Sequence, residues 1–596
     1  MLGVSESQKF FAYFIRQAIP LEGPLHKRYE GIAGHSKYAK TFLPALKELH
    51  FWQLRLAQMC ISRSALKVSK DNYRVKISKI KKQTMTSLKK NIVFNFIGQF
   101  YVGFIGIITL PLYLNLLGAE AYGLIGVFTL LQAWMQILDL GLSPTLSRQI
   151  AASKSTISKN GTKIRTLLKS LEFIFSITAI AAALSIYLAS DWVAQEWLST
   201  QEIQHSIVSN CIMIMGLIVA IRWPVTLYRG GINGYEQQPW QNIANIIITT
   251  LRFPASLALI WASIIDIYGY FIFQLAISLI EMVAFKIKIN SLLPPKTKNC
   301  PFFSPSAIRE VLPFAASSAY IGALWVLVTQ LDKLILTSIL PLNEYGYFSL
   351  VATISSAIIV LSGPLSTAIL PRMTSQLSLG NTSDMLNIYR LSTRFLTCII
   401  APVVLTIAIY PHELIQLWTN NTEASSWAKD ILPLFAIGNG LLAIGSFQSY
   451  LQYAHGNISL NVKYNTISSI LAIPAIYYFA TNYGAIGAGY TWIAFRLITL
   501  IIWTPFVHKK LAPGTHKKWI TFDVLIPIAS SVIFTSILSN IPHESLDESR
   551  ALGCIYLAIL TVSSIVFSLI FNFPREAKKL FTQVFLESRT RKPHPG

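Results

Sequence analysis

Charged residues are scarce in this chain. Only 13% of its 596 residues are Asp, Glu, Lys or Arg, whereas 53% are hydrophobic and the mean hydropathy is +0.49. A soluble chain of this length has about twice that charged fraction. The apolar residues also form runs of about 20 or more, the length that a helix needs to cross the ~30 Å hydrocarbon layer of a membrane. The composition therefore excludes an ordinary soluble protein and predicts an all-α polytopic membrane protein, since backbone groups in lipid must be paired within helices.

Cysteines are few, and several catalytic motifs are missing. The five cysteines are scattered without a Cys-x-x-Cys pair, so neither a disulfide framework nor a zinc site is expected. The sequence has no Walker-type glycine loop, no His-Glu-x-x-His and no Gly-x-Ser-x-Gly. An ATP motor in the same chain is thereby excluded, and we expect no metal, no cofactor and no enzymatic activity.

Negative charge is in short supply, which leaves a formal net charge of +23. Residues 1–90 hold 18 Lys and Arg against 5 Asp and Glu, and the remaining excess lies mainly in alternate loops. Loops rich in Lys and Arg mark the cytosolic side of a membrane protein. The charge therefore predicts topology, with both termini in the cytosol, and it does not indicate a nucleic-acid partner.

Hydropathy predicts about fourteen spans, whose order divides the chain into segments. The spans cover residues 91–116, 121–144, 168–190, 204–227, 238–263, 266–287, 308–340, 345–370, 389–410, 428–452, 461–480, 484–507, 519–540 and 549–572. The expected segments are a basic N-terminal extension (1–84), a first six-helix bundle (85–287), a cytosolic linker (288–307), a second six-helix bundle (308–507), a basic cytosolic loop (508–518), two additional transmembrane helices (519–572) and a basic cytosolic tail (573–596). The extension is expected to be poorly ordered or interfacial, with a targeting peptide or a folded domain as the alternative.

The two predicted bundles resemble each other in sequence. The matching stretches are Tyr122-Gly123 with Tyr345-Gly346, Asn245–Pro254 with Asn465–Pro474, and Tyr268-Gly269 with Tyr483-Gly484. Their offsets stay between 215 and 223 residues. We therefore predict two bundles of the same orientation, related by a pseudo-two-fold axis along the membrane normal.

Several stretches together resemble a known family of transporters. They are NIVFNFIGQFYVGFIGIITLPLYLNLLGAEAYG in the first span, DLGLSPTLSRQIA after the second, and TQLDKLIL and NEYGYFSL in the seventh and eighth. Over about residues 88–507 the chain is similar to the polysaccharide transporter (O-antigen-type flippase) family of the multidrug/oligosaccharidyl-lipid/polysaccharide exporter superfamily. The resemblance implies alternating access and a polyprenyl-diphosphate-linked oligosaccharide as cargo. It also implies the inner membrane of a bacterium, contact with membrane lipids, and a polysaccharide polymerase and chain-length regulator as partners.

One arginine stands near the middle of an apolar span. Arg252 lies 14 residues past Gln238 and 11 before Ser263, which places it close to the bilayer midplane. A central Arg on a lipid face costs about 2.5–3.5 kcal/mol, so the side chain should face the bundle interior or a cavity. Pro254 removes a backbone donor and can turn carbonyl groups toward that cavity. Arg252 is therefore a candidate ligand for an anionic cargo, and a structural ion pair is the alternative.

Further charges within the spans give further candidates. Arg496 is a further candidate cavity cation for binding the cargo, and Glu281 is a candidate for coupling. The two residues lie at equal depth under the repeat, so they could also bridge the two bundles or pair within each bundle. Arg222 and Lys333 add cations near the cavity, although either side chain could also reach water at the membrane surface. Asp332 has no such route and is the candidate for coupling to a proton or sodium gradient.

The second span ends with two more charges. Asp139 and Arg148 flank the break between Gly141 and Pro144 at the expected cytosolic mouth. This position indicates gate or helix-end residues and not a central binding site.

The excess of cations over carboxylates in the spans favours an anionic cargo. A guanidinium group binds the paired oxygens of a diphosphate in a bidentate manner and stays charged. The predicted function is therefore a flippase for a lipid-linked oligosaccharide. The alternatives are a lipid II flippase, a multidrug exporter of the same superfamily, and, with the least support, a membrane polysaccharide polymerase, for which the outer loops offer no arranged catalytic groups.

Overall fold

The computed structural model describes residue 98 and residues 101–139, 141–153, 157–293, 301, 303–457, 459–540 and 549–574. Contacts divide the chain into two compact units, Met1–Leu88 and Lys89–Gly596, and all of the described residues belong to the second unit. The expectations for residues 1–84 and for most of the C-terminal tail lie outside the described residues.

The described residues are almost entirely helical and contain no strand, which confirms the predicted all-α membrane fold. The helices of the first bundle are Tyr101–Leu117, α5 (Ala119–Leu138), α6 (Leu142–Ser153), α7 (Ile157–Trp192), α8 (His205–Gly234), α9 (Gln238–Thr250), α10 (Ser256–Trp261) and α11 (Ile267–Leu292). Those that follow are α12 (Pro305–Ile339), α13 (Leu342–Val360), α14 (Gly363–Ser378), α15 (Thr382–Ile409), α16 (Pro411–Thr419), α17 (Thr422–Ala428), α18 (Leu432–Gly445), α19 (Phe447–Ala454), α20 (Ser459–Ile498), α21 (Thr504–Leu511), α22 (His516–Lys518), α23 (Ile526–Ser539) and α25 (Arg550–Asn572). Four π-helical segments interrupt them, namely η2 (Val193–Trp197), η3 (Leu251–Ala255), η4 (Thr499–Trp503) and η5 (Trp519–Leu525).

Ten helices in the described part of the chain are long and apolar enough to cross a membrane. The predicted eleventh and twelfth spans are joined in one of them, which reverses at Gly484, where φ is +58° and glycine is favoured. The predicted first, second and eighth spans coincide with helices outside these ten, Tyr101–Leu117, α5 and α13. Fourteen spans therefore remain a prediction.

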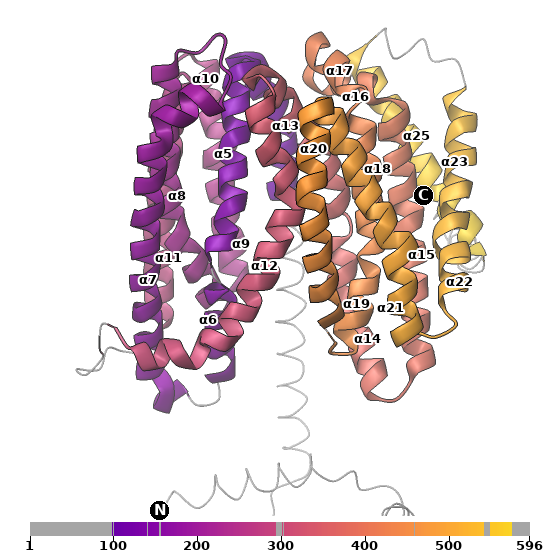
Figure 1. Ribbon diagram of the computed structural model, residues 1–596, viewed down its shortest axis with the longest axis horizontal. Coiled ribbons are helices and arrows are strands. Elements are labelled where there is room, and N and C mark those ends of the chain that lie inside the picture. The colour runs from indigo at the N-terminus through magenta and orange to yellow at the C-terminus, as the bar shows by residue number, and fades with distance from the viewer. Residues whose placement is uncertain are drawn as a thin grey trace, which may run out of the picture. The chain divides into compact units, whose positions relative to one another are not determined.

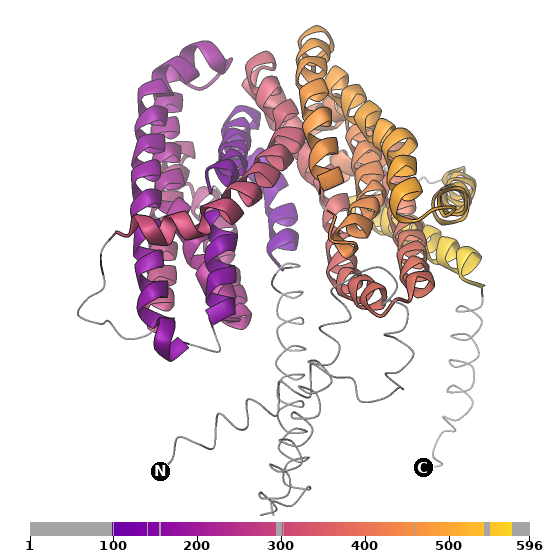
Figure 2. The ribbon, with the colours of Figure 1, turned by 60° about the horizontal axis from the view of Figure 1, so that its bottom comes forward.

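The helices form two bundles that stand side by side (Figure 1). The helix α12 links them, because its first half runs along α6 and α7 and its second half packs on α20. Figure 2 shows this diagonal path from one bundle to the other. One apolar core fills the lower part of the first bundle, and a second core continues from its upper part through the second bundle. The two bundles thus share a continuous core mainly at their upper ends.

The repeat seen in the sequence is visible at that upper contact, where α5 packs on α13. A Cβ atom on Gly123 would collide with the carbonyl oxygen of Leu342, and one on Gly346 with the carbonyl oxygen of Ala119. Gly123 and Gly346 are 223 positions apart, and so are Ala119 and Leu342. The pseudo-two-fold rotation that relates the bundles therefore converts one of these contacts into the other. The crossing therefore lies on the pseudo-symmetry axis and requires glycine at both positions for close approach.

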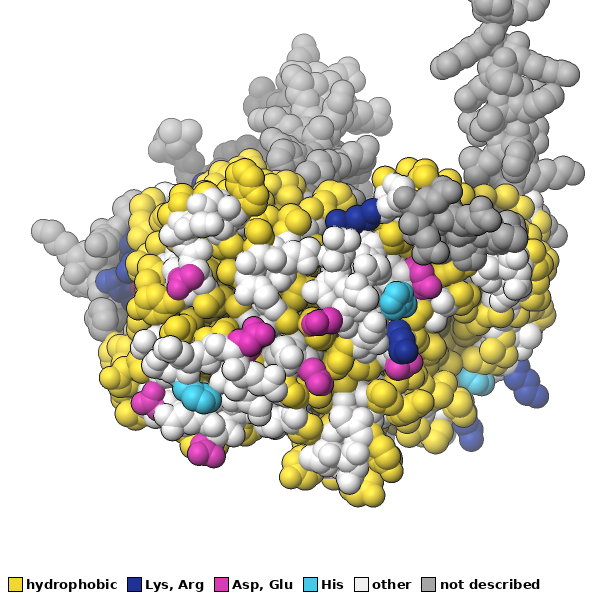
Figure 3. Space-filling view, turned by 90° about the horizontal axis from the view of Figure 1, so that it is seen from above, with side chains coloured by type: hydrophobic (Ala, Val, Ile, Leu, Met, Phe, Trp, Pro, Cys, Tyr) yellow, Lys and Arg dark blue, Asp and Glu magenta, His cyan; other side chains and the backbone are white. Residues whose placement is uncertain are grey.

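The upper face of the molecule carries more Asp and Glu than Lys and Arg (Figure 3). Loops on the outer side of a membrane protein are poor in Lys and Arg. The α5–α13 contact lies toward this face, so in the predicted topology it closes the outer end of the space between the bundles.

The two additional helices pack on the second bundle through hydroxyl groups. Ser531 Oγ donates to Ser568 Oγ at 3.2 Å between α23 and α25, and Thr561 Oγ1 donates to Thr406 Oγ1 of α15 at 3.1 Å. The buried carboxylate of Asp523 in η5 accepts from Arg390 and Arg394 of α15 at 2.7 and 2.6 Å. Small polar residues allow close packing of membrane helices. These contacts fix the pair to α15.

Candidate substrate-binding cavity

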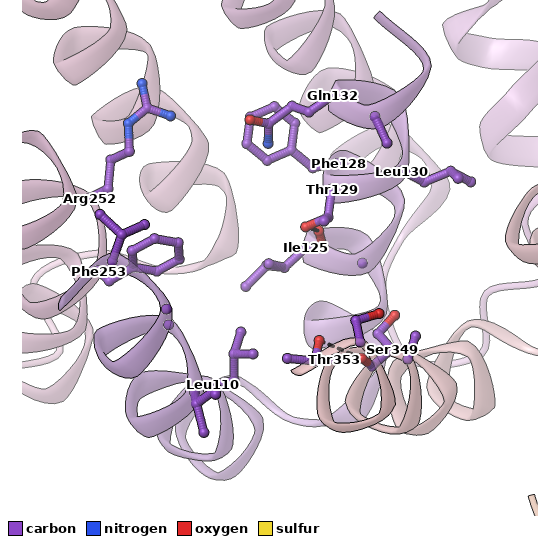
Figure 4. Close-up of a pocket in the computed structure, with 18 of the residues that line it drawn as sticks. Leu110, Ile125, Phe128, Thr129, Leu130, Gln132, Arg252, Phe253, Ser349 and Thr353 are labelled. Carbon is purple, nitrogen blue, oxygen red and sulfur yellow. Dashed lines mark hydrogen bonds between the residues drawn. The ribbon is translucent and has the colours of Figure 1, made fainter. Parts of the chain in front are cut away.

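A cavity of about 800 Å³ lies between the bundles, below the α5–α13 crossing. Its walls come from Tyr101–Leu117, α5, α8, α9, η3 and α11 on one side and from α12 and α13 on the other. Figure 4 shows Arg252 and Phe253 facing Ile125, Phe128 and Gln132 of α5 across this space. Its polar lining includes Gln132, Arg222, Arg229, Asn245, Thr249, Arg252, Gln274, Glu281, Gln330, Lys333, Ser349 and Thr353. A largely apolar pocket with a few convergent polar groups is the usual form of a ligand site.

The helix that carries Arg252 widens at this residue. Pro254 lacks a backbone donor, and the chain accommodates it in the π-helical turn η3. The carbonyl of Arg252 accepts from Gln274 Nε2 at 2.9 Å, and that of Phe253 accepts from Tyr113 Oη at 2.8 Å. Side chains of neighbouring helices thus satisfy these two carbonyl groups. The same turn places Arg252 in the cavity wall.

Three arginines surround one buried carboxylate in this wall. Glu281, whose side chain is 2% exposed, accepts from Arg252 and from Arg229 at 2.6 Å each. Arg222 Nε lies 3.7 Å from the same carboxylate. Arg252 Nη2 also donates to Ser278 Oγ at 3.2 Å, while its Nε has no hydrogen-bond partner among the described residues. We call Arg222, Arg229, Arg252 and Glu281 the arginine cluster.

The arginine cluster keeps an excess of positive charge. Three guanidinium groups face one carboxylate, so two positive charges remain without an acidic partner in the cluster. The Arg222 and Arg229 side chains are 27% and 29% exposed, and the guanidinium of Arg229 also lies over the Phe285 ring at 4.6 Å. Charges in a site shielded from water act more strongly than charges at the surface. The wall can therefore attract a doubly charged anion into the cavity.

Arg252 meets both descriptions considered from the sequence, a cavity-facing cation and a member of an ion pair. It forms an ion pair with Glu281 and it also lines the cavity. Glu281 pairs within the first bundle in this structure and not with Arg496, since all three of its ion-pair partners lie on α8 and η3.

Arg229 was not singled out in the sequence. It lies seven residues, or about two helical turns, after Arg222, so the two side chains share one face of α8. The i, i+7 spacing of two arginines in an apolar helix is the signal that could have found it.

The second bundle places its charges differently. Arg496 is buried on α20 with its guanidinium 4.0 Å above the Trp492 ring, and its Nε and Nη2 have no hydrogen-bond partner among the described residues. It does not line the large cavity. Lys333 does; its Nζ donates to the Thr329 carbonyl at 2.7 Å and lies 3.9 Å from Asp332 Oδ1. That oxygen is buried and accepts no hydrogen bond in the described part of the structure. Asp332 is thus only weakly paired.

The residues at the end of the second span lie apart from the arginine cluster. Asp139 accepts from Ser143 and, at 3.3 Å, from Thr226 of α8. The guanidinium of Arg148 lies 4.4 Å from the ring centre of Phe314 on α12. Gly141 between them has a φ of +65° and closely approaches the α12 backbone at Ala315. Arg148 and Gly141 therefore contact α12, the helix that links the bundles.

No group of three or more His, Cys, Asp and Glu side chains suited to a metal ion occurs among the described residues. The arrangement offers cations, amides and hydroxyls, and it can bind an anion that carries neutral polar groups.

The sequence and the fold were compared with known proteins. A family model described as "Polysaccharide biosynthesis protein" matches residues 88–377. No match was found among curated proteins. The match, together with the structures below, confirms the resemblance to the polysaccharide transporter family that the sequence motifs indicated.

Three solved structures illustrate the likeness in fold. A lipid II flippase MurJ in an inward closed conformation is 14% identical, with a TM-score of 0.65, covering 80% of this chain and 98% of that one. An inward-facing multidrug resistance MATE transporter of the MOP superfamily is 15% identical, with a TM-score of 0.55 and coverage of 70% and 96%. A MOP superfamily transporter from Pyrococcus furiosus, whose binding pocket is described as having reverse polarity, is 13% identical, with a TM-score of 0.50 and coverage of 72% and 96%. The chain has the fold of these exporters.

Proposed function

We propose that this membrane transporter of the multidrug/oligosaccharidyl-lipid/polysaccharide exporter superfamily is a flippase. Its cargo is a polyprenyl-diphosphate-linked oligosaccharide, such as an O-antigen or other surface polysaccharide repeat unit. It moves this lipid from the cytosolic to the outer leaflet by alternating access. The observation that carries the proposal is the arginine cluster, which lines a large cavity with more cations than carboxylates.

The charge of the cargo suits the arginine cluster. A diphosphate that joins a polyprenol to a sugar is esterified at both ends, so each phosphate carries one negative charge at neutral pH. The two excess positive charges of the arginine cluster balance this charge. Arg252 Nη2 already donates to Glu281 and Ser278, so the remaining N–H groups of Arg252 can bind phosphate oxygens only singly. Arg229 has one hydrogen bond to Glu281 and keeps further donors for phosphate oxygens. Guanidinium groups do not lose their charge on burial.

The remaining lining suits the two ends of the cargo. Amide side chains of Gln132, Asn245 and Gln330 can hydrogen-bond sugar hydroxyls. The wall toward Tyr101–Leu117 and the end of α13 is apolar, and Phe104 and Val360 there are 53% and 64% exposed. A polyprenyl chain can remain against such a surface while its headgroup enters the cavity.

Accumulation of the lipid in the outer leaflet against its gradient needs coupling to an energy source. Asp332 is our candidate for binding a proton or sodium ion, because it is the carboxylate with the weaker pairing. Glu281 serves the arginine cluster as its counter-ion, and we rank it second for coupling. Asp139 and Arg148 are candidates for the cytosolic gate, opposite the α5–α13 contact. Arg222 and Lys333 line the cavity and help to attract the anion. Arg496 does not line the cavity, so it can attract the anion only through its charge at longer range.

We place the protein in the inner membrane of a bacterium, with both termini in the cytosol. A polysaccharide polymerase and a chain-length regulator would receive the flipped lipid. A lipid II flippase is the second candidate, because the diphosphate chemistry is the same and a lipid II flippase shares the fold over 80% of this chain.

The test is a flipping assay with purified protein in liposomes. Undecaprenyl diphosphate carrying a labelled oligosaccharide is incorporated, and its exposure is followed with a membrane-impermeant glycosidase. Wild-type protein should expose lipid from the protected leaflet faster than protein-free liposomes do, and Arg252→Ala should remove most of that increase. Lipid II, assayed in parallel, separates the two candidates. Equal rates with and without protein for both lipids contradict the proposal.

A further inference from the structure

A small side chamber of about 120 Å³ opens beside the large cavity in the second bundle. The two spaces share Gln330, Lys333 and Ser356 in their walls. Because about 30 Å³ is the share of one water in the liquid, the chamber has room for about four waters or for one polar substituent of a larger ligand. It thus extends the cargo cavity on the side opposite the arginine cluster.

The wall of the side chamber combines polar side chains with aromatic ones. Asp332 Oδ1 lies in it without a hydrogen bond among the described residues, and Trp492 forms an aromatic part of the wall. Trp492 Nε1 donates to Asn439 Oδ1 at 3.0 Å, and Arg496 covers its ring. Gly438 lies so close that a side chain there would collide with the indole. The chamber therefore offers a fixed aromatic group, amides, hydroxyls and an unused acceptor.

We propose that the side chamber is a subsite that recognises one sugar residue of the glycan. This inference rests on the proposed function and deepens it. A free carboxylate oxygen, amides and hydroxyls beside an aromatic ring match the hydroxyl groups and apolar C–H faces of a sugar ring. The subsite distinguishes sugars by the substituent that enters the chamber.

Other occupants fit the chamber less well. A phosphate would meet the carboxylate of Asp332, and a prenyl chain would leave the polar wall without partners. A metal cation would meet Lys333, whose Nζ already lies 3.9 Å from Asp332 Oδ1. In this assignment Asp332 accepts from a sugar hydroxyl, and coupling passes from Asp332 to Glu281, the second candidate proposed above for that role.

The experiment compares glycans that share one lipid and one diphosphate. Undecaprenyl diphosphate carrying a single N-acetylglucosamine, the same lipid carrying a single galactose, and the same lipid without a sugar are assayed in proteoliposomes. The last lipid is followed with a labelled headgroup-reactive probe. We expect wild-type protein to flip one glycosylated lipid at least tenfold faster than the other.

The chamber variant is Gln330→Leu combined with Ser356→Ala. Loss of two hydrogen bonds to one sugar should reduce the ratio of the two rates about tenfold, toward one. Gln376→Leu is the matched control, because Gln376 on α14 lines neither the large cavity nor the side chamber, and it should leave the ratio unchanged. Asp332→Asn separates the two roles considered for Asp332. It keeps an acceptor oxygen, so a role in the subsite predicts an altered ratio with transport retained, whereas a role in coupling predicts loss of transport of every lipid.

The outcomes separate the two proposals. If wild-type protein flips none of the three lipids, the flippase function fails, and the subsite fails with it. If it flips them but shows no preference, or if the chamber variant slows both glycosylated lipids equally, only the subsite is wrong. Loss of transport of every lipid in Asp332→Asn assigns Asp332 to coupling and removes it from the subsite.

Discussion

The two bundles share a fold and a symmetric contact, yet their buried charges are arranged in opposite ways. In the first bundle Glu281 gathers three arginines, and the resulting positive wall faces an 800 Å³ cavity. In the second bundle the equivalent position holds Arg496, which stacks on Trp492, and Asp332 lies weakly paired beside a much smaller chamber. The repeat therefore determines the scaffold, while differences at single equivalent positions, such as Glu281 and Arg496, determine what each bundle can bind.

The largest difference between the two bundles is expected when Glu281, the carboxylate shared by three arginines, is removed. Glu281→Leu leaves three buried or half-buried arginines without their acid, and loss of one member of a buried ion pair costs about 3–5 kcal/mol. We expect a large fall in the thermal midpoint of the purified protein, followed by tryptophan fluorescence. Asp332→Leu should lower the midpoint clearly less, because only one ion-pair contact, at 3.9 Å, is lost. Equal losses would show that the two carboxylates have the same structural role.

The second largest effect is expected on transport. Arg252→Ala removes the most deeply buried cation of the cavity wall and should lower the flipping rate about 100-fold, as for loss of a strong charge-assisted hydrogen bond. Arg252→Lys keeps the charge but loses the planar guanidinium group, so we expect the flipping rate to fall about tenfold. Arg496→Ala should lower the rate less than either, since Arg496 does not line the cavity. A greater loss in Arg496→Ala would move the anion site to the second bundle.

The symmetric contact itself can be disturbed. Gly346→Ala places a methyl group against the carbonyl of Ala119, and overpacking of this kind costs about 1–3 kcal/mol. We expect the α5–α13 contact to loosen, so that a cysteine introduced at Ser349 becomes more reactive toward an impermeant thiol reagent added from outside. Gly322→Ala on α12 is the control, because no atom lies within 4 Å of its added Cβ. Equal reactivity in both variants contradicts a closed outer contact.

The smallest effect is expected from Arg222, the member of the arginine cluster with the longest ion-pair distance to Glu281. Arg222 lies 3.7 Å from Glu281 and is 27% exposed, so Arg222→Gln should lower the flipping rate only two- to threefold. Arg229→Gln removes a 2.6 Å ion pair and should lower it about tenfold.

The sequence predicted much of this fold because bilayer physics restricts it. Long apolar runs must be helices, and the repeated Tyr-Gly pairs marked the two places where glycine permits the α5–α13 crossing. It could not predict the path of α12, which depends on packing between bundles. It also could not show that the eleventh and twelfth spans form one hairpin around Gly484 with scarcely any loop.

The candidate site was predicted in part, for a similar reason. Arg252 was identified because a charge at midplane depth needs a polar surrounding. Its partner Glu281 was not identified, because the pairing depends on which faces of α8, η3 and α11 meet. The sequence suggested Arg496 as the partner of Glu281 instead. Arg229 was missed since it lies near a helix end, where an arginine can reach water without any special role.

Binding of the lipid diphosphate to the arginine cluster is the most direct test of this account. Undecaprenyl diphosphate, undecaprenyl monophosphate and undecaprenol are titrated onto detergent-solubilised protein, and complexes are counted by native mass spectrometry. We predict preference for the diphosphate in wild-type protein, loss of that preference in Arg252→Ala, and its retention in Gln132→Leu. Equal binding of all three lipids, or an unchanged preference in Arg252→Ala, would contradict the account.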